Sequence, residues 1–255
     1  MSEVSAYEAA KSHLHNLGLQ GALSVLSERL DADKQESHLV FLSRLLGTEI
    51  EGRHSRRRET LRRFAGFPGE FRLGDYDFDY QPKLERKIIT ELASLSFIGD
   101  ARNVIFIGPP GVGKTMLAVA LGYEAIEAGY KTIYTSAIDL VTRFHKAALN
   151  GRFDQVMRPF ETASLVIIDE LGYLPMGPEG ASYLFDLVSR RYLRGSIILT
   201  TNRPISSWGS VLSDSVLAAA LLDRLLHRCA VIPIEGESYR MRSYLEQASV
   251  LRKGV

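Results

Sequence analysis

The chain has 255 residues, of which 45% are hydrophobic and 24% are charged, ordinary values for one large globular domain or one domain with a small appendage. Its 31 basic and 30 acidic residues give a net charge of +1, so the bulk charge predicts no particular partner. The single cysteine, Cys229, excludes an internal disulfide framework and a cysteine zinc site, and the longest apolar run, Val216 to Leu222, is far too short to span a membrane.

Residues 1–65 are predicted to form a small all-α domain with a role in DNA binding or oligomerisation. Leucines recur near helical spacing from Leu14 to Leu30, and a second helical pattern runs from Leu39 to Ile50. The opening residues lack the apolar core of a secretory signal peptide. We therefore expect a soluble, cytoplasmic protein.

The end of this region is the most charge-biased part of the chain. Six arginines against one acid, Glu59, give the stretch from 53 to 63 a charge of +5. The arginines are Arg53, Arg56, Arg57, Arg58, Arg62 and Arg63. Nothing close in the sequence neutralises them, so we interpret the stretch as a binding surface for nucleic-acid phosphates, tolerant of sequence and sensitive to salt. A solvated helix face or a hinge between domains is the alternative.

Residues 66–82 have the composition of a linker, with glycines, prolines, aromatics and aspartates but no period. Residues 83–255 are then expected to form the second, larger domain. A segment of this kind often lies against a nucleotide base, and Phe78, Tyr80 or the apolar helix expected from Leu84 to Leu95 are open candidates for that contact.

The stretch GPPGVGKT fits the phosphate-loop pattern at every fixed position, with Gly108, Gly113, Lys114 and Thr115 in register. Four apolar residues precede it and a helix-compatible run, Met116 to Ala128, follows it. In that context, backbone N–H groups and the start of the helix surround a polyphosphate, Lys114 adds charge, and the Thr115 hydroxyl is a ligand for Mg²⁺. The predicted nucleotide-binding residues are Gly108, Pro109, Pro110, Gly111, Val112, Gly113, Lys114, Thr115 and Met116.

From residue 103 onward, short apolar runs alternate with helical stretches, which predicts an α/β fold with a five-stranded parallel sheet. The strand candidates are 103–108, 132–135, 165–169, 197–201 and 230–233. The third ends in Asp169 and Glu170, at the edge where ligands of such sheets bind. We expect Asp169 to hold Mg²⁺ and Glu170 to polarise the attacking water, and Asn202, after the fourth strand, to orient that water or contact the γ-phosphate.

Two arginine pairs follow this region. Arg224 and Arg228 lie four residues apart, which predicts one shared helix face, and either of them could act in the site of a neighbouring subunit. Pairing with a surface acid such as Asp223 is the alternative. Arg240 and Arg242 begin a last predicted helix that could fold back over the nucleotide.

Together these elements resemble an AAA+ P-loop NTPase of the initiator and helicase-loader branch, and most closely the IstB-type transposition helper ATPases of bacterial insertion sequences. The resemblance covers about residues 70 to 248 and is carried by IFIGPPGVGKTMLAVAL, VIIDELGYLP, LFDLVSRRYLRGSIILTTN followed by Trp208, LLDRLLHR and GESYRMR. Leu193 and Thr201 depart from the expected pattern, at positions outside the proposed chemistry.

The resemblance implies roles for single residues. Asn202 corresponds to the first sensor, Arg224 to an arginine finger acting in trans, with Arg228 as the other candidate, and Arg240 to the second sensor. It also implies ATP and Mg²⁺ as cofactors, homo-oligomeric rings or spirals, double-stranded DNA bound without sequence preference, and a cognate transposase, with no membrane. Arg143, Lys146 and Arg152 are a second candidate set for facing DNA.

A replicative helicase loader of the DnaC/DnaI type is the competing function, because it shares the same ATPase elements. Residues 1–65 hold no cysteine, which argues against loaders with a cysteine-zinc module and leaves the others open. A protein that holds nucleotide only as a structural ligand is the third interpretation, and it would leave Glu170 idle.

Overall fold

The computed structural model describes residues 3–32, 38–173 and 175–242. The chain divides into two compact units, residues 1–60 and 61–255. The helix α3 (His38–Ala65) carries the boundary between them, and each unit is described by itself. In the described residues, no helix is both long and apolar enough to cross a membrane.

The first unit is helical, as the sequence predicted. It contains α1 (Glu3–Asn16), α2 (Gln20–Ala32) and the first part of α3. Its small core is formed by Ala22, Leu26 and Leu45, with Tyr7 and Phe41 among the residues packed against them.

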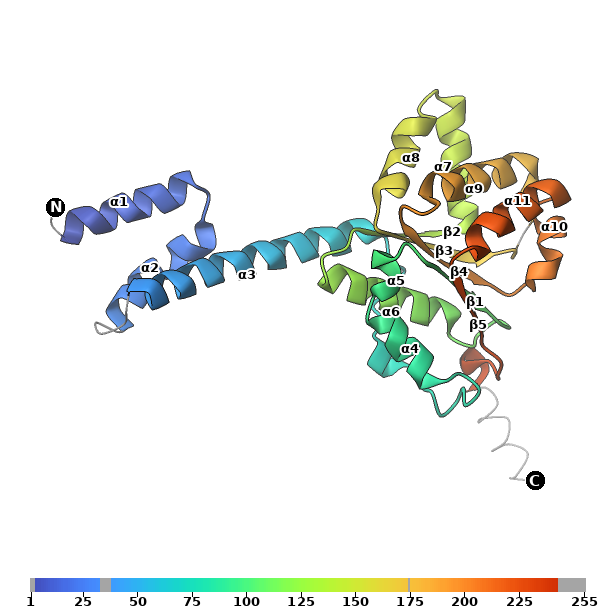
Figure 1. Cartoon of the computed structure of the whole chain (residues 1–255), viewed down its shortest axis with the longest axis horizontal. Helices are drawn as coiled ribbons and strands as arrows, with labels where there is room; N and C mark the ends of the chain where they lie inside the picture. Colours follow the sequence, from blue (N-terminus) through green and yellow to red (C-terminus); the bar gives the residue numbers. More distant parts are fainter. Residues whose placement is uncertain (1–2, 33–37, 174, 243–255) are drawn as a thin grey trace. The chain divides into compact units, whose positions relative to one another are not determined.

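The second unit contains the predicted parallel sheet, and all five strand candidates are confirmed (Figure 1). The strands are β1 (Asn103–Ile107), β2 (Thr132–Ser136), β3 (Leu165–Leu171), β4 (Ser196–Thr201) and β5 (Cys229–Pro233). They lie in the order β2-β3-β4-β1-β5, and every neighbouring pair is parallel. The carboxyl ends of β1, β3 and β4 therefore meet at one edge, which is where a nucleotide site is expected.

Helices cover both faces of this sheet, because alternate residues of each buried strand enter two different cores. The helices of this unit are α4 (Arg86–Ala93), α5 (Ser96–Gly99), α6 (Lys114–Glu127), α7 (Ala137–Leu149), α8 (Phe153–Thr162), α9 (Gly177–Arg191), α10 (Trp208–Val211) and α11 (Ser215–Leu226), with short 3-10 turns at Leu73–Asp75, Ile205–Ser207 and Tyr239–Met241. Ile105 and Ile168 pack with α7, α8, α9 and α11, whereas Phe106 and Ile167 pack with α4, α5 and α6. Figure 1 shows these two sets of helices on opposite faces of the sheet.

The structure differs from the sequence-based expectations at three places. Residues 66–82 belong to the second unit and pack against it, because their aromatic side chains have a surface to cover. The helix α11 ends at Leu226, so Arg228 does not share a helix face with Arg224. Arg240 lies in a 3-10 turn, and the rest of the expected last helix falls outside the described residues.

Candidate nucleotide-binding site

The loop between β1 and α6 is packed so closely that three of its residues have no room for a side chain. A Cβ atom on Gly108 would lie 2.1 Å from the Ile234 carbonyl oxygen, and one on Gly111 would lie 2.0 Å from Ser238 Oγ. A Cβ on Gly113 would lie 2.5 Å from the Tyr76 ring. Gly111 and Gly113 also have φ angles of +85° and +92°, which favour glycine. Contacts with two distant segments therefore define the shape of the loop.

Two hydrogen bonds attach these segments to the loop. The Tyr76 hydroxyl donates to the Val112 carbonyl at 2.9 Å, and the Tyr239 N–H donates to the Gly111 carbonyl at 2.9 Å. Burial raises the pKa of Tyr76 to about 12, so the phenol remains a donor at neutral pH. The Gln81 side-chain amide joins the two segments to each other by donating to the Glu237 carbonyl at 2.8 Å. The stretch that composition predicted to be a linker is thus part of the site.

The C-terminal segment also brings two arginines to this region. Arg242 pairs with Asp77 at 3.0 Å and lies over the rings of Tyr80 and Tyr239. Arg240 is close enough for its charge to act on Lys114. The segment from Ile234 to Arg242 therefore lies against the loop, and its folding over a bound nucleotide stays a prediction. The residue that contacts the base stays a prediction.

Lys114 and Thr115 begin α6, directly after the loop. The Lys114 ammonium donates to the carbonyls of Gly108 and Pro109, both at 2.7 Å. Burial lowers the pKa of Lys114, with a smaller effect in the same direction from Arg240, while Asp169 and Glu170 act in the opposite direction. The Thr115 hydroxyl lies 3.0 Å from both carboxylate oxygens of Asp169. The first and second predicted motifs therefore meet, as expected.

Asp169 is 3% exposed and is surrounded by hydroxyl donors. Besides Thr115, the Tyr134 phenol donates to its Oδ2 at 2.8 Å, and the Thr200 hydroxyl donates to its Oδ1. Burial, and then the Asp169 charge, raise the pKa of Tyr134, so this phenol also stays protonated. Sequence reasoning missed Tyr134 and Thr200. Tyr134 lies in the largely polar strand TIYTS and gave no signal, whereas Thr200 follows the apolar run of β4 and could have been noticed.

Glu170 has a backbone conformation that its neighbours must maintain. Its φ is +60°, in the left-handed region, and its side chain is exposed. The pairing of β3 with β4 advances from Ile168 opposite Leu199 to Leu171 opposite Thr201, so one extra residue forms a bulge at Asp169 and Glu170. The bulge lets Asp169 stay buried while Glu170 turns outward. Strained backbone of this kind is common at functional sites.

Asn202 follows β4 at the same edge of the sheet. Its Oδ1 is buried and has no hydrogen-bond partner among the described residues. A buried polar atom without a partner is costly, so Asn202 has an acceptor that a ligand or its water could satisfy. The structure thus places Asn202 where the sequence expected it, and its role as a sensor stays a prediction.

These residues fit a nucleoside triphosphate with Mg²⁺. The phosphate loop leads directly into α6, and the N–H groups at the start of a helix are suited to bind phosphate oxygens. The Thr115 hydroxyl and the Asp169 carboxylate are the hard oxygen ligands that Mg²⁺ prefers. In the parts of the chain that the structure describes, no cluster of three or more His, Cys, Asp or Glu residues could hold a metal, so the other ligands would come from phosphate and water.

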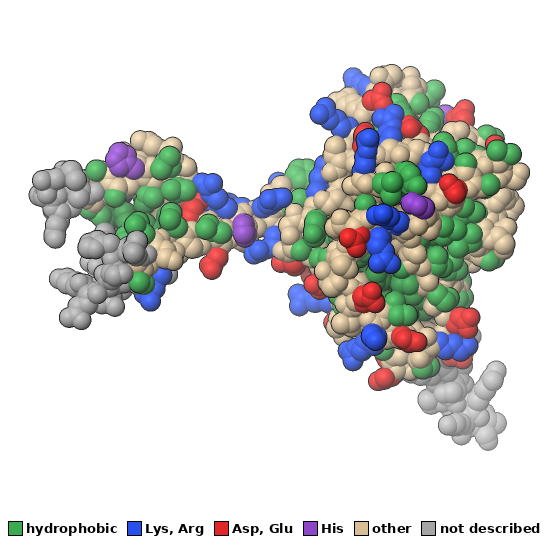
Figure 2. All heavy atoms as spheres, in the orientation of Figure 1, with side chains coloured by type: hydrophobic (Ala, Val, Ile, Leu, Met, Phe, Trp, Pro, Cys, Tyr) green, Lys and Arg blue, Asp and Glu red, His purple; other side chains and the backbone are tan. Residues whose placement is uncertain are grey.

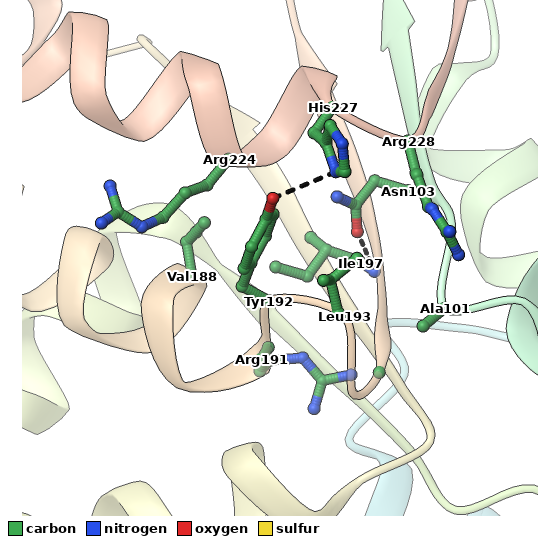
Figure 3. Close-up of a pocket in the computed structure, with 11 residues that line it drawn as sticks. Ala101, Asn103, Val188, Arg191, Tyr192, Leu193, Ile197, Arg224, His227 and Arg228 are labelled. Carbon is green, nitrogen blue, oxygen red and sulfur yellow. Dashed lines mark hydrogen bonds between the residues drawn. The ribbon is translucent and has the colours of Figure 1, made fainter.

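The two candidates for the arginine finger lie at the opposite end of the strands, near the residues where β1, β4 and β5 begin (Figure 3). The Arg224 guanidinium stacks over the Phe185 ring at 4.7 Å and donates to the Ala220 carbonyl. Arg228 is exposed, and its guanidinium lies 3.5 Å from the Asp100 carbonyl. In Figure 3 the two side chains point away from each other. The structure does not bring either arginine to the phosphate loop of its own chain.

A third arginine in this region, Arg191, is buried and binds backbone carbonyls. It is 1% exposed and donates to backbone carbonyls that include Ala163 and Ser196, both at 2.8 Å. Burial lowers its pKa to about 10, so it remains charged at neutral pH. Arg191 therefore stabilises the fold by joining the start of β4 to the end of α8 and the residues that follow it.

The arginine-rich segment has more acidic partners in the structure than its sequence indicated. Figure 2 shows basic side chains along α3. However, Arg53 and Arg56 form ion pairs with Glu49 at 2.7 and 3.6 Å, and Arg62 pairs with Glu127. The expectation that nothing nearby neutralises the cluster is wrong, because these acids are distant in sequence or one helical turn away. The role of the segment in binding DNA stays a prediction.

Comparison with known proteins identifies the relatives of this chain. The family described as IstB-like ATP binding protein matches residues 9–247. A putative ATP-binding protein of insertion sequence IS5376 from Geobacillus stearothermophilus is 41% identical over 238 residues, which cover 91% of this chain and 95% of the relative. The corresponding protein of IS21 from Pseudomonas aeruginosa is 42% identical over 224 residues, covering 88% and 84%.

Solved structures with the same fold are more distant in sequence. AMPPCP-bound DnaA from Aquifex aeolicus has a TM-score of 0.57 and 21% identity, and the match covers 72% of this chain and just over half, 56%, of the DnaA chain. The DnaC helicase loader has a TM-score of 0.51 and 19% identity, with 58% and 86% covered. These likenesses establish an AAA+ P-loop fold.

The close approach of Gly111 to Ser238 yields a first test. We expect Gly111→Ala to weaken binding of a fluorescent ATP analogue by tenfold or more, because the added methyl group must displace Ser238 or the loop. Gly129→Ala is the matched control, since Gly129 has a φ of +86° but no atom within 4 Å of the added Cβ. This variant should carry the same backbone strain, roughly 1–2 kcal/mol, and should have a lower melting temperature but an unchanged affinity for the ATP analogue. Equal affinities in the two variants would contradict the packing argument.

Proposed function

The chain belongs to the family of IstB-like ATP-binding proteins, and from this premise we propose that it is an ATPase that assembles on double-stranded target DNA and activates a cognate transposase. The observation that carries the proposal is the meeting of the phosphate loop with a buried and an exposed carboxylate at one sheet edge. A site that only held nucleotide would not need the outward-facing acid.

The chemistry follows from this arrangement. A water oxygen forms a bond to the γ-phosphorus, the bond to the ADP oxygen breaks, and Glu170 accepts the proton that the water loses. Lys114 stabilises the phosphate charge, and the Asn202 amide orients the water or contacts the γ-phosphate. A Mg²⁺ ion held by Thr115 and Asp169 would neutralise phosphate charge. Positioning and electrostatics therefore supply the catalysis.

The position of the finger candidates supports assembly of several copies. Arg228 precedes β5, and Ile234, whose carbonyl borders Gly108, follows it. The six residue steps between them span roughly 20 Å at about 3.3 Å per residue, which is longer than an arginine side chain. An arginine at this end of the strands therefore does not reach the phosphates of its own chain. If it acts as a finger, it acts in the site of another copy, and the proposed ring or spiral would supply that copy.

Two basic surfaces support contact with DNA phosphates. One is the arginine-rich part of α3. The other is an open hollow on α7, α8 and the turn between them, lined by Arg143, Lys146 and Arg152 with Asn150 among the other residues. Cations of this kind bind the backbone without reading bases. The names of these relatives place them in insertion sequences, which supports transposition as the process that this chain serves.

Replacement of the outward-facing acid tests the chemical role. We expect Glu170→Gln to retain ATP binding and ATP-dependent assembly while its turnover falls about 10²–10⁴-fold, because the amide cannot accept the proton. Phosphate release and analogue binding are measured side by side. Glu91→Gln, at an exposed position of α4, is the control and should turn over like the parent protein. Rapid hydrolysis by Glu170→Gln would remove Glu170 from the mechanism.

Mixing experiments test the finger. Lys114→Ala lacks a working loop but keeps the arginines, so it should restore hydrolysis when mixed with whichever of Arg224→Ala or Arg228→Ala has lost the finger. The finger variant alone should bind ATP but hydrolyse it about 10³–10⁵-fold more slowly. Arg194→Ala, an exposed arginine near the same edge, is the control and should need no rescue. Full activity of both candidate variants, or inactivity that no mixture restores, would count against a finger in trans.

The DNA partner separates the proposed function from a helicase loader. Electron microscopy should show ordered oligomers on duplex DNA with ATP and none with ADP. The double variant Arg57→Gln and Arg58→Gln should reduce the slope of log affinity against log salt by about 0.9 for each phosphate that it no longer neutralises, whereas Lys87→Gln should leave it unchanged. Assembly only on single strands, or only with a replicative helicase present, would favour the loader. Assembly under no condition would refute both.

A further inference from the structure

We propose that Thr200 is a positioning residue that sets both acidic side chains of the site at once, and that Tyr134 positions Asp169 alone. The proposal rests on the ATPase function proposed above and adds two residues that act through the acids without touching the reacting atoms. It starts from the bulge in β3, because the bulge removes a regular ladder partner from Glu170.

Thr200 is 1% exposed and lies on β4 opposite the two bulged residues. Its hydroxyl accepts a hydrogen bond from the Glu170 N–H at 2.9 Å and donates its own hydrogen to Asp169 Oδ1. A hydroxyl has one hydrogen and two acceptor lone pairs, so one atom can make both bonds. A single Oγ1 atom therefore connects the backbone of Glu170 to the carboxylate of Asp169.

The bond from the Glu170 N–H stabilises an unfavourable backbone conformation. The φ angle of Glu170 is +60°, which is unfavourable for a residue with a side chain, so the conformation persists only when neighbouring groups hold it. The Thr200 side chain provides such a group, and it is stiff because it is branched at Cβ. Because this hydrogen bond fixes the backbone of Glu170, it also limits the positions that the Glu170 carboxylate can take at the carboxyl end of β3.

Tyr134 differs from Thr200 in what it reaches. Its phenol donates to Asp169 Oδ2 at 2.8 Å from β2, on the other side of β3. It gives no hydrogen bond to the Glu170 backbone among those that the structure shows in the described residues. When Thr115 turns toward a metal ion, Thr200 and Tyr134 are the two hydroxyls left to orient the Asp169 carboxylate. We therefore expect substitutions of Thr200 and of Tyr134 to cause different defects.

Three substitutions separate these roles. Thr200→Val keeps the shape of the side chain but removes the hydroxyl, Thr200→Ser keeps the hydroxyl, and Tyr134→Phe removes only the phenolic oxygen. Thr132→Val is the matched control for the same chemical change at a buried position, since Thr132 is 2% exposed on β2 and bonds only weakly to the Tyr130 carbonyl at 3.4 Å.

Three measurements distinguish the variants. Hydrogen–deuterium exchange of the peptide that contains Glu170 reports its N–H directly. The Mg²⁺ concentration needed for tight binding of a non-hydrolysable fluorescent ATP analogue reports Asp169. Turnover at saturating Mg²⁺ reports Glu170.

Thr200→Val should exchange faster at Glu170, need about 10–100-fold more Mg²⁺, and remain slow at saturating Mg²⁺. Tyr134→Phe should need more Mg²⁺ but keep normal exchange at Glu170 and regain its turnover when Mg²⁺ saturates. Thr200→Ser should restore most of each loss, and Thr132→Val should match the parent protein in all three.

The proposal is overturned if Thr200→Val and Thr132→Val behave alike, or if Tyr134→Phe and Thr200→Val show the same defects. If Thr200→Val does not fold, failure of Thr200→Ser to match the parent protein in exchange and Mg²⁺ dependence overturns it as well. A parent protein that binds ATP but never hydrolyses it would refute the ATPase function, and exchange and Mg²⁺-dependent binding would still decide whether Thr200 positions the acids.

Discussion

The burial of the Asp169 carboxylate is the constraint on which the rest of the site depends. A carboxylate that is 3% exposed is stable only when its oxygens are hydrogen-bonded. The donors come from α6, β2 and β4, so three elements must hold their register with β3 before Asp169 can be satisfied. The same donors bring the Thr115 hydroxyl beside Asp169. A requirement of folding and the requirement of the proposed metal binding are therefore met by one set of contacts, and the neighbouring Glu170 stays exposed.

Much of this arrangement could be predicted from the sequence. The strands were predictable because each is a short, mostly apolar run, and the phosphate loop because its glycines stand at fixed spacing before Lys114 and Thr115. The bulge at Glu170 and the contacts of Thr200 were not, since they depend on the register between two strands about 30 residues apart. Residues 66–82 had the composition of a linker, but Tyr76 occupies the space that Gly113 leaves. Composition gave no sign of that partner.

The arginine-rich segment shows how a charge pattern in sequence can mislead. Glu49 is almost fully buried and accepts hydrogen bonds from the N–H groups of Gly21 and Ala22 at the start of α2. Its bond to Arg53, and then these two N–H groups, hold the pKa of Glu49 below its ordinary value. The stability gained is present at neutral pH and is lost as the pH falls through the lowered pKa. Arg53 therefore has a structural role in the first unit, and DNA contact is not needed to explain its presence.

The charges around the phosphate loop bear on the proposed finger. Besides burial, which lowers the pKa of Lys114, the charges of Asp169, Arg240 and Glu170 act on this side chain. In the proposed reaction, negative charge spreads over the transferred phosphoryl group as the bond to ADP breaks, and an added arginine stabilises that charge. Arg224 and Arg228 lie where β1, β4 and β5 begin, away from the phosphate loop of their own chain. Under the proposed function, an arginine from a second copy would therefore complete the site.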